Sequence, residues 1–399
     1  MATAATIADQ FIVTFGREPE YCSRAPGRVN LIGEHTDYND GLVLPMAIDR
    51  SVDLWFAPRS DATVHLSSLN FSQSHRFSLD QPIAKSEFGW ANFVLGVVAE
   101  LKSMNVPLTG MDALIDGNIP VASGLSSSAA IEIATVLAFL QTTNSTWATP
   151  LEIAQIGQRA EQNFIGVQCG LMDQFISAAA IAGTALKIDC YSMSYEAVEI
   201  PEQISMVVAN TKLSRSLAAS AYNERREECT LAFDRLKRVL VQQDQFHHPP
   251  DAIHKLNASM LERGEALLPV KLSRRLRHVV SENGRVEQAA AILCRQPFDP
   301  AALGQLLNES HNSLRDDFEV SSEGLNRVVL IMQSSPGCFG ARLTGAGFGG
   351  CAIALVDSNQ LVSFLAEVRE RSVDFDPQPD FFPVIPSSGG EVKQLNSDD

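Results

Sequence analysis

The sequence lacks the features that mark several classes of protein. Its seven cysteines are odd in number and none forms a CxxC pair, so neither a disulfide framework nor a zinc site is predicted, and reduced thiols in a reducing compartment are expected. No apolar run is long enough to span a bilayer. The N-terminal segment has no basic region followed by an apolar one, so no signal peptide is predicted. These absences indicate a soluble, cytoplasmic protein.

Positive charge is also scarce. The 31 Lys and Arg residues stand against 47 Asp and Glu residues, which gives a formal net charge of −16. This balance disfavours nucleic acid and anionic membranes as partners, because both are polyanions. It does not exclude one small anion held in a locally positive pocket. With 399 residues, the chain is long enough for two domains and a sizeable core.

Hydrophobic periodicity predicts strands as well as helices in the first half of the chain. Residues 111–120 (MDALIDGNIP) alternate apolar and acidic side chains, as a half-buried strand does, and an apolar helix follows the serine-rich segment after them. A further helix is predicted to begin at Thr149. Pro150 stands in its first turn, where the missing N–H costs nothing, and Glu152 completes a capping box.

The character of the chain changes after a predicted strand at 205–210. A charged helix is expected over 214–242, and it leads to a linker with the sequence QFHHPPD at 245–251. We therefore predict an α+β protein in two lobes, with the first lobe at residues 1–200 and the second at 201–399.

Residues 117–130 (GNIPVASGLSSSAA) place a glycine and three serines between a predicted strand and a predicted helix. Gly124 allows a ligand to approach the backbone, and helix N-terminal amides with serine hydroxyls form a ready anion site, so phosphate is the natural ligand. The alternative is that Ser126 to Ser128 only cap the helix. Because one serine suffices for a cap, the pattern favours phosphate. A Walker A loop is excluded, since GxxxxGK[ST] is absent.

Residues 343–350 (LTGAGFGG) formally match GxGxxG. The context excludes a dinucleotide site, because the motif precedes the strand-like CAIALV (351–356) rather than a helix. Two interpretations stay open. The loop is either a tight turn between strands or a place where backbone approaches a ligand or another loop closely.

Asp173 stands in the otherwise apolar segment CGLMDQF (169–175). A carboxylate in such a setting needs a partner, because burying an unpaired charge is costly. One interpretation is a general base that Arg28 keeps ionised. The other is an Asp that caps the helix beginning here.

Residues 27–41 (GRVNLIGEHTDYNDG) gather many polar side chains in one short segment. Glu34, His35 and Asp37 invite a metal site, but on an extended loop neighbouring side chains point apart, so three ligands within four residues rarely converge on one ion. Carboxylates and imidazole also hydrogen-bond sugar hydroxyls, and such a site discriminates strongly against analogues that lack them. A plain solvated loop is the remaining alternative.

Together these segments resemble the GHMP small-molecule kinases, and within them the galactokinases. The resemblance rests on three motifs in the family's order, with two shorter segments between them. The motifs are residues 27–49, 117–130 and 341–351, and the shorter segments are 169–175 and 221–229.

The resemblance implies a two-lobed α+β fold with the active site in the cleft between the lobes. It implies that the last strand returns to the first lobe. Residues implied to bind the sugar hydroxyls are Glu34, His35, Asp37, Gly170 and Tyr222. Asp173 would face the anomeric hydroxyl, with Arg28 beside it. Residues implied to bind ATP are Gly124, Leu125, Ser126, Ser127 and Ser128 around the phosphates and Trp90 near the adenine, with Ser128 and Glu161 as the magnesium ligands.

The activity implied by the resemblance is transfer of a phosphoryl group from MgATP to the C1 hydroxyl of α-D-galactose, the first committed step of galactose catabolism. The implied partners are the sugar and MgATP, and a monomer is expected. Two alternatives stay open. One is a kinase for N-acetylgalactosamine or L-arabinose, and the other is a sensor that binds sugar and ATP without catalysis. The intact SSSAA at 126–130 and the presence of Asp173 favour an enzyme.

Overall fold

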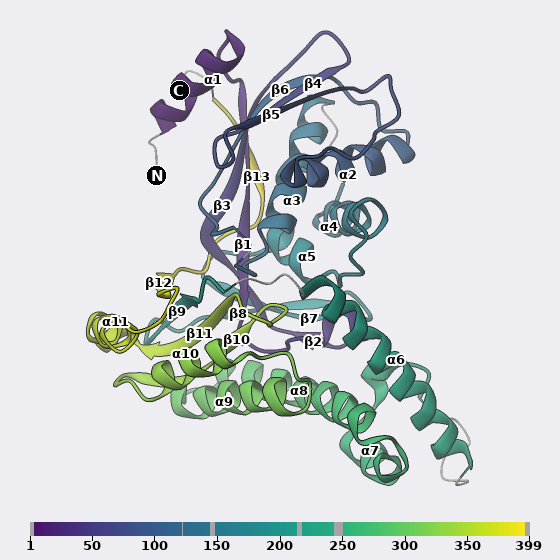
Figure 1. Ribbon diagram of the computed structural model, residues 1–399, viewed down its shortest axis with the longest axis vertical. Helices are drawn as coiled ribbons and strands as arrows, with labels where there is room; N and C mark the ends of the chain where they lie inside the picture. Colours follow the sequence, from purple (N-terminus) through teal and green to yellow (C-terminus); the bar gives the residue numbers. More distant parts are fainter. Residues whose placement is uncertain (1–3, 122, 144–147, 214–217, 243–249, 396–399) are drawn as a thin grey trace.

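A computed structural model describes residues 4–121, 123–143, 148–213, 218–242 and 250–395 of the chain. One half of the molecule is built on a six-stranded sheet with the order β13-β1-β3-β6-β4-β5 (Figure 1). Neighbouring strands are antiparallel except β4 and β6, which are parallel. The strands are β1 (Tyr21–Asn30), β3 (Pro45–Pro58), β4 (Thr63–Ser68), β5 (Gln73–Ser78), β6 (Met111–Gly117) and β13 (Glu391–Gln394).

Helices that include α3 and α5 cover one face of this sheet, and α3 packs directly on β1 and β3, whereas α1 packs on the opposite face against Trp55 and Leu114 (Figure 1). The helices of this half are α1 (Ala4–Phe15), α2 (Gly89–Ser103), α3 (Ser127–Thr142), α4 (Pro150–Arg159) and α5 (Met172–Ala179). Residues 129–136 of α3 are all buried, as expected for a helix that is apolar on all sides. Because α3 is packed in the core, its N-terminal residues Ser127 and Ser128 are held in position at the pocket described below.

The other half contains a four-stranded sheet with the order β10-β11-β9-β12, covered by helices that include α9 and α10. Its strands are β9 (Ile204–Asn210), β10 (Cys338–Thr344), β11 (Cys351–Asp357) and β12 (Asp380–Val384). Its helices are α6 (Ala218–Gln242), α7 (Ala258–Gly264), α8 (Val270–Cys294), α9 (Pro300–Asp316), α10 (Glu323–Gln333) and α11 (Leu361–Glu370). A three-stranded sheet of β2 (Leu42–Val43), β7 (Thr184–Asp189) and β8 (Tyr195–Glu199) completes the fold.

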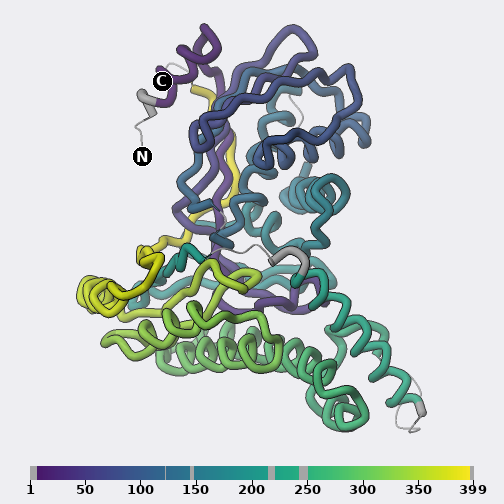
Figure 2. Tube along the Cα trace, in the orientation of Figure 1, coloured from purple at the N-terminus to yellow at the C-terminus, as the bar shows by residue number. Residues whose placement is uncertain are grey.

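The two ends of the chain meet in the first half. Figure 2 shows the last strand, in yellow, running beside the first strand, in purple, and β13 pairs with β1 in antiparallel register from Tyr21 opposite Gln394 to Arg24 opposite Glu391. This pairing ties the tail of the chain to its first strand. Within the described ranges, no helix combines the length and the apolar character needed to cross a bilayer.

The predicted α+β class is confirmed, and so are most of the elements expected from periodicity. The capping box is present, because the Thr149 side chain accepts from Glu152 N and the Glu152 carboxylate accepts from Thr149 N at 2.7 Å. The expectation of a half-buried strand at 111–120 is wrong in one respect. Asp112 is buried and not exposed, and an ion pair with Arg59 at 2.9 Å compensates for the burial of its carboxylate. Most of the expected linker at 245–251 lies outside the described residues.

Candidate active site

A pocket of about 580 Å³ opens between the two halves of the molecule. Its wall comes mostly from the first half, with Tyr222, Gly345 and Ala346 added from the second. The residues proposed from the sequence that line it are Arg28, Glu34, His35, Asp37, Trp90, Gly124, Ser126, Ser127, Ser128, Glu161, Gly170, Asp173 and Tyr222. Leu125 is instead fully buried, and only its carbonyl oxygen takes part in the site, by accepting from Arg28 N at 3.0 Å.

Asp173 and Arg28 form a two-pronged ion pair in the middle of the pocket. Arg28 Nε and Nη2 each lie 2.9 Å from a different carboxylate oxygen of Asp173, and Ser126 Oγ donates to the same carboxylate at 2.5 Å. Arg28 also donates to the carbonyl oxygen of Gly124 at 2.6 Å. The helix-cap interpretation of Asp173 is wrong, since Leu171 occupies the N-cap position and the carboxylate bonds Arg28 and Ser126 instead.

The local backbone of β1 explains how Arg28 reaches the pocket. The register with β3 shifts between Pro26 and Arg28, and such a bulge turns a side chain out of the regular alternation of the strand. Gly27 makes the bulge possible, because a Cβ there would lie 2.6 Å from the Leu125 carbonyl oxygen. Glycine at this position therefore allows the strand to touch the serine-rich loop.

The serine-rich loop has the backbone of an anion site. Gly124 (φ +85°) and Ser126 (φ +62°) both adopt left-handed conformations, and α3 begins at the next residue. Ser126 is the N-cap of α3 but makes no side-chain cap hydrogen bond, since its hydroxyl goes to Asp173. The capping interpretation therefore fails for Ser126. The positive end of the α3 dipole lies at the pocket wall, where Ser127 and Ser128 stand.

The glycine-rich loop after β10 combines both interpretations that the sequence left open. It connects the antiparallel strands β10 and β11, and it also approaches the serine-rich loop, because a Cβ on Gly345 (φ +80°) would lie 2.8 Å from the Gly124 carbonyl oxygen. Gly345 N also donates to the Glu34 carboxylate at 2.8 Å. This loop is therefore in contact with the segments proposed for phosphate and for sugar.

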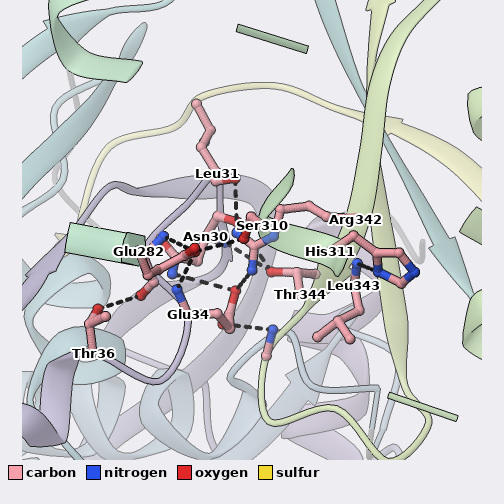
Figure 3. A network of polar contacts seen from close by, with 12 residues as sticks. Asn30, Leu31, Glu34, Thr36, Glu282, Ser310, His311, Arg342, Leu343 and Thr344 are labelled. Atoms are coloured by element: carbon pink, nitrogen blue, oxygen red, sulfur yellow. Dashed lines mark hydrogen bonds and ion pairs between the residues drawn. The ribbon is translucent and has the colours of Figure 1, made fainter. Parts of the chain in front are cut away.

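Glu34 is nearly inaccessible and is held by an ion pair from the other half of the molecule (Figure 3). Its partner is Arg342 of β10, which is fully buried. Arg342 Nη1 also donates to the carbonyl oxygens of Asn30 at 3.1 Å and Leu31 at 2.9 Å. One guanidinium thus holds both the backbone and the carboxylate of the 27–41 segment.

A second buried charge, Glu282 of α8, holds the same segment by its amides (Figure 3). It accepts from Gly33 N at 2.9 Å, from Glu34 N at 3.2 Å and from Ser310 Oγ at 2.7 Å. Burial acts to raise the pKa of Glu282, but Arg285 and other neighbouring cations outweigh it and lower the pKa to about 2. Glu282 therefore stays ionised as an anchor.

Sequence reasoning missed both anchors. Arg342 carried a weak signal, because it is a cation inside the otherwise apolar strand β10. Glu282 carried none, since it lies on α8 among many charged residues and its role depends on contacts across about 250 positions of the chain.

His35, Asp37, Gly170 and Tyr222 converge on one side of the pocket. The rings of His35 and Tyr222 lie 5.7 Å apart, and burial lowers the pKa of His35 well below its usual range, so the imidazole is neutral. A Cβ on Gly170 would lie 1.9 Å from Asp37 Oδ2, so any larger residue there would displace the Asp37 carboxyl group. These side chains present a neutral ring, a phenol and a carboxyl group to the same space, which suits a ligand with several hydroxyls.

The Asp37 carboxyl leads to a testable pH dependence. Burial, and then the nearby Asp173, raise the pKa of Asp37 from 3.8 to about 7. The ligand-free protein therefore loses stability from this group as the pH rises from about 4 through 7, because the folded state binds the proton more tightly than the unfolded state. We expect Asp37→Asn to gain stability relative to wild type at pH 8 compared with pH 5. Urea unfolding at both pH values measures this, and a difference that does not change with pH would contradict it.

The far end of the pocket is aromatic. Phe71 and Trp90 face each other with ring planes 5° from parallel and centroids 6.5 Å apart, and Trp90 Nε1 donates to Gln73 Oε1 at 2.9 Å. Phe93 also lines this end. The parallel rings of Phe71 and Trp90 offer flat apolar surfaces on which a planar ring of a ligand could pack. Phe71 escaped the sequence analysis because it stands in a loop with no recognisable motif.

Ser128 and Glu161 supply a hydroxyl and a carboxylate to the pocket wall. Burial, and then Asp173, raise the pKa of Glu161 to about 7. No group of three His, Cys, Asp or Glu residues suited to a metal occurs among the described residues, which rules against the metal interpretation of Glu34, His35 and Asp37. None of the seven cysteines, all of which lie in the described ranges, forms a disulfide.

Comparison with known proteins decides the family. A model described as the galactokinase galactose-binding signature matches residues 9–58, and models for the GHMP kinase N-terminal and C-terminal domains match 92–183 and 289–373. A galactokinase from Roseiflexus sp. (strain RS-1) is 43% identical over 94% of this chain and 93% of its own. The chain belongs to the galactokinase family of GHMP kinases. The family uses ATP as a substrate.

Other members of the galactokinase family agree. A galactokinase from Chloroflexus aggregans is 42% identical over 92% of this chain and 91% of its own. The crystal structure of Lactococcus lactis galactokinase complexed with galactose matches with a TM-score of 0.89 and 35% identity, covering 98% of this chain and 99% of that one. A mevalonate kinase with a TM-score of 0.64 and 20% identity shares the fold, so the expected two-lobed GHMP kinase fold is confirmed.

Proposed function

We propose that this member of the galactokinase family transfers the γ-phosphoryl group of ATP to the C1 hydroxyl of α-D-galactose. The observation that carries the proposal is the Arg28–Asp173–Ser126 cluster, which lies in one pocket between the polar side chains of the 27–41 segment and the N-terminus of α3. A sugar on one side and a triphosphate on the other would meet at this cluster.

Asp173 is proposed to face the C1 hydroxyl and to take its proton as the oxygen attacks phosphorus. The Arg28 guanidinium pairs with this carboxylate and places a cation where the transferred group gains charge. Phosphoryl transfer asks little covalent chemistry of a protein, so positioning and charge neutralisation provide most of the catalysis. The amides of α3 and Ser127 would bind the phosphate oxygens.

The sugar hydroxyls would be bound by Glu34, His35, Asp37, Gly170 and Tyr222. Since Arg342 and Gly345 N already hold Glu34, its oxygens are fixed in place before a ligand arrives. Prior fixation lowers the entropy lost on binding and favours a ligand whose hydroxyls match the fixed acceptors.

Mg²⁺ fits the residues at the phosphate side. It prefers oxygen ligands and keeps several waters, so the Ser128 hydroxyl and the Glu161 carboxylate are a sufficient protein contribution beside ATP oxygens. Burial, and then Asp173, raise the pKa of Glu161, and a bound cation would favour its charged form. When bound, Mg²⁺ would neutralise phosphate charge in the transition state.

We also propose that residues 1–200 and 201–399 form the two lobes of the enzyme. The proposal is supported by the six-stranded sheet, in which every strand except β13 comes from the first range. The returning β13 ties the end of the second range to the first.

A kinase assay against a panel of sugars tests the function. The panel is galactose, 2-deoxygalactose, N-acetylgalactosamine, L-arabinose and glucose, with ADP release as the signal. We expect galactose to give the highest kcat/KM. Equal activity on glucose would overturn the sugar assignment. A higher kcat/KM on N-acetylgalactosamine or L-arabinose would change the substrate, and binding without ADP release would indicate a sensor.

Phe71 provides a test of the ATP side. Its ring is 43% exposed, so Phe71→Ala should fold normally while removing one of the two parallel aromatic faces. Because stacking of a base on an aromatic ring contributes about 1–3 kcal/mol, KM for ATP should rise about tenfold with KM for galactose unchanged. Steady-state kinetics with each substrate varied separately would show this. A rise in KM for galactose alone would place the adenine elsewhere.

A further inference from the structure

Glu132 is a fully buried carboxyl that the proposed chemistry does not use. It lies on α3, one helical turn after Ser128, and Gln174 Nε2 donates to its Oε2 at 3.0 Å. The same Gln174 nitrogen donates to Glu161 Oε2 at 2.8 Å. An amide nitrogen has two hydrogens, so Gln174 donates one hydrogen bond to each carboxyl group. It thereby connects Glu132 to Glu161, the proposed metal ligand.

Two oxygens in this group have no hydrogen-bond partner. They are Glu132 Oε1 and Gln174 Oε1, and both are buried. Burial, and then Glu161, raise the pKa of Glu132 well above its usual range, so the carboxyl is neutral and carries an O–H. Both oxygens are satisfied at once if this O–H donates to Gln174 Oε1, which gives the doubly hydrogen-bonded pair of an acid and an amide.

Packing leaves Gln174 little freedom to turn. A Cβ on Gly157 of α4 would lie 3.1 Å from Gln174 Cγ and 3.4 Å from Glu132 Cβ, so the α4 backbone closes over both side chains. Gln174 itself is fully buried on α5, next to Asp173. The Gln174 amide that donates to Glu161 is therefore fixed by residues of three helices, α3, α4 and α5.

We propose that Gln174, locked by Glu132, is a positioning residue that holds the Glu161 carboxylate in the orientation required by the divalent cation of the nucleotide. The proposal rests on the proposed function only in taking Glu161 as a metal ligand. Residues that orient metal ligands in this way change metal affinity by about 10–100-fold when they are replaced.

The test compares ADP binding with and without the metal. Isothermal titration calorimetry gives the Kd of ADP in MgCl₂ and in EDTA, and the ratio of the two Kd values measures how strongly Mg²⁺ supports the nucleotide. We expect Gln174→Met to reduce this ratio about tenfold. The Kd in EDTA and the Kd for galactose should stay at the wild-type values, which a general loss of structure would not allow.

Glu132 supplies a second and sharper comparison. Glu132→Gln should keep the ratio, because an amide also donates to Gln174 Oε1 and accepts from its Nε2. Glu132→Met should reduce it, since it removes the hydrogen bonds that fix the direction of the Gln174 amide within its packed site, yet an apolar side chain in this buried place should not prevent folding. If Glu132 were itself an ionised ligand of the metal, Glu132→Gln would lower the ratio of the two Kd values, as Gln174→Met is expected to do. That result would contradict the proposal.

Gln333→Met is the matched control. Gln333 Nε2 also bridges two acceptors, Asn308 Oδ1 at 2.7 Å and the Ala341 carbonyl oxygen at 2.8 Å, but away from the pocket. It should leave the ratio unchanged. A wild-type ratio in Gln174→Met would overturn the inference with the proposed function intact. Failure of wild type to bind or phosphorylate any sugar of the panel would overturn the proposed function, and the ADP ratio would still decide the role of Gln174.

Discussion

Asp173→Asn is expected to lower kcat with galactose and MgATP by about 10³-fold, within the range of about 10²–10⁴ that a positioned acid or base contributes. The substitution keeps the size of the side chain, but it removes the charge that pairs with Arg28 and the capacity to take the C1 proton. Galactose binding should survive, because the other sugar contacts come from the 27–41 segment, Gly170 and Tyr222. Steady-state kinetics and calorimetry with galactose would measure the two effects separately.

Asp53→Asn is a close control for this prediction. Asp53 also receives two hydrogen bonds from one arginine, Arg24, at 2.8 and 2.5 Å, and a third from Ser51 Oγ at 2.8 Å, but it lies outside the pocket. Its substitution should change kcat little. If well-folded Asp173→Asn kept near-normal turnover, Asp173 would be neither a base nor an orienting charge.

Arg342→Met is expected to lower the free energy of unfolding by about 3–5 kcal/mol, because it leaves the buried Glu34 carboxylate without its ion-pair partner. It should also weaken galactose binding, since Asn30 and Leu31 lose the donor that holds their carbonyl oxygens. Urea unfolding measures the first effect, and calorimetry with galactose the second.

The double variant Arg342→Met with Glu34→Gln separates stability from binding. Removing both charges should restore much of the stability, since a buried ion pair is often replaced by neutral groups at little cost. Galactose affinity should remain low, because the sugar segment has still lost its anchor. Arg315→Met breaks the exposed pair with Asp316 and should cost no more than about 1 kcal/mol. A wild-type free energy of unfolding in the Arg342→Met single variant would show that the buried Arg342–Glu34 pair does not stabilise the fold.

Local chemistry in the sequence was sufficient for much of the fold and for part of the pocket wall, whereas Trp90, Glu161, Gly170 and Tyr222 were implied only by the family resemblance. The capping box at Thr149 and the apolar pattern of α3 depend on neighbours within a few residues, so they were predictable and are present. The glycine and serine motifs were predictable for the same reason, because left-handed backbone and close approach require particular residue types wherever the chain folds. Gly124 and Gly345 both have left-handed backbone conformations, and their loops lie so close together that a Cβ on Gly345 would lie 2.8 Å from the Gly124 carbonyl oxygen.

Only the tertiary structure could decide which of these groups meet and what holds them. Arg28 and Asp173 are 145 positions apart, and the sequence alone left helix capping as an equal role for Asp173. Arg342 and Gln174 lie in segments that the sequence analysis singled out, but nothing in those segments indicated their roles, and Glu282 lies in no motif. Each is a buried polar group whose partners lie on other helices and strands, so its role depends on packing between distant segments and not on the residues next to it. The sequence by itself therefore determined the kinds of group in the pocket, and the fold determined their pairing.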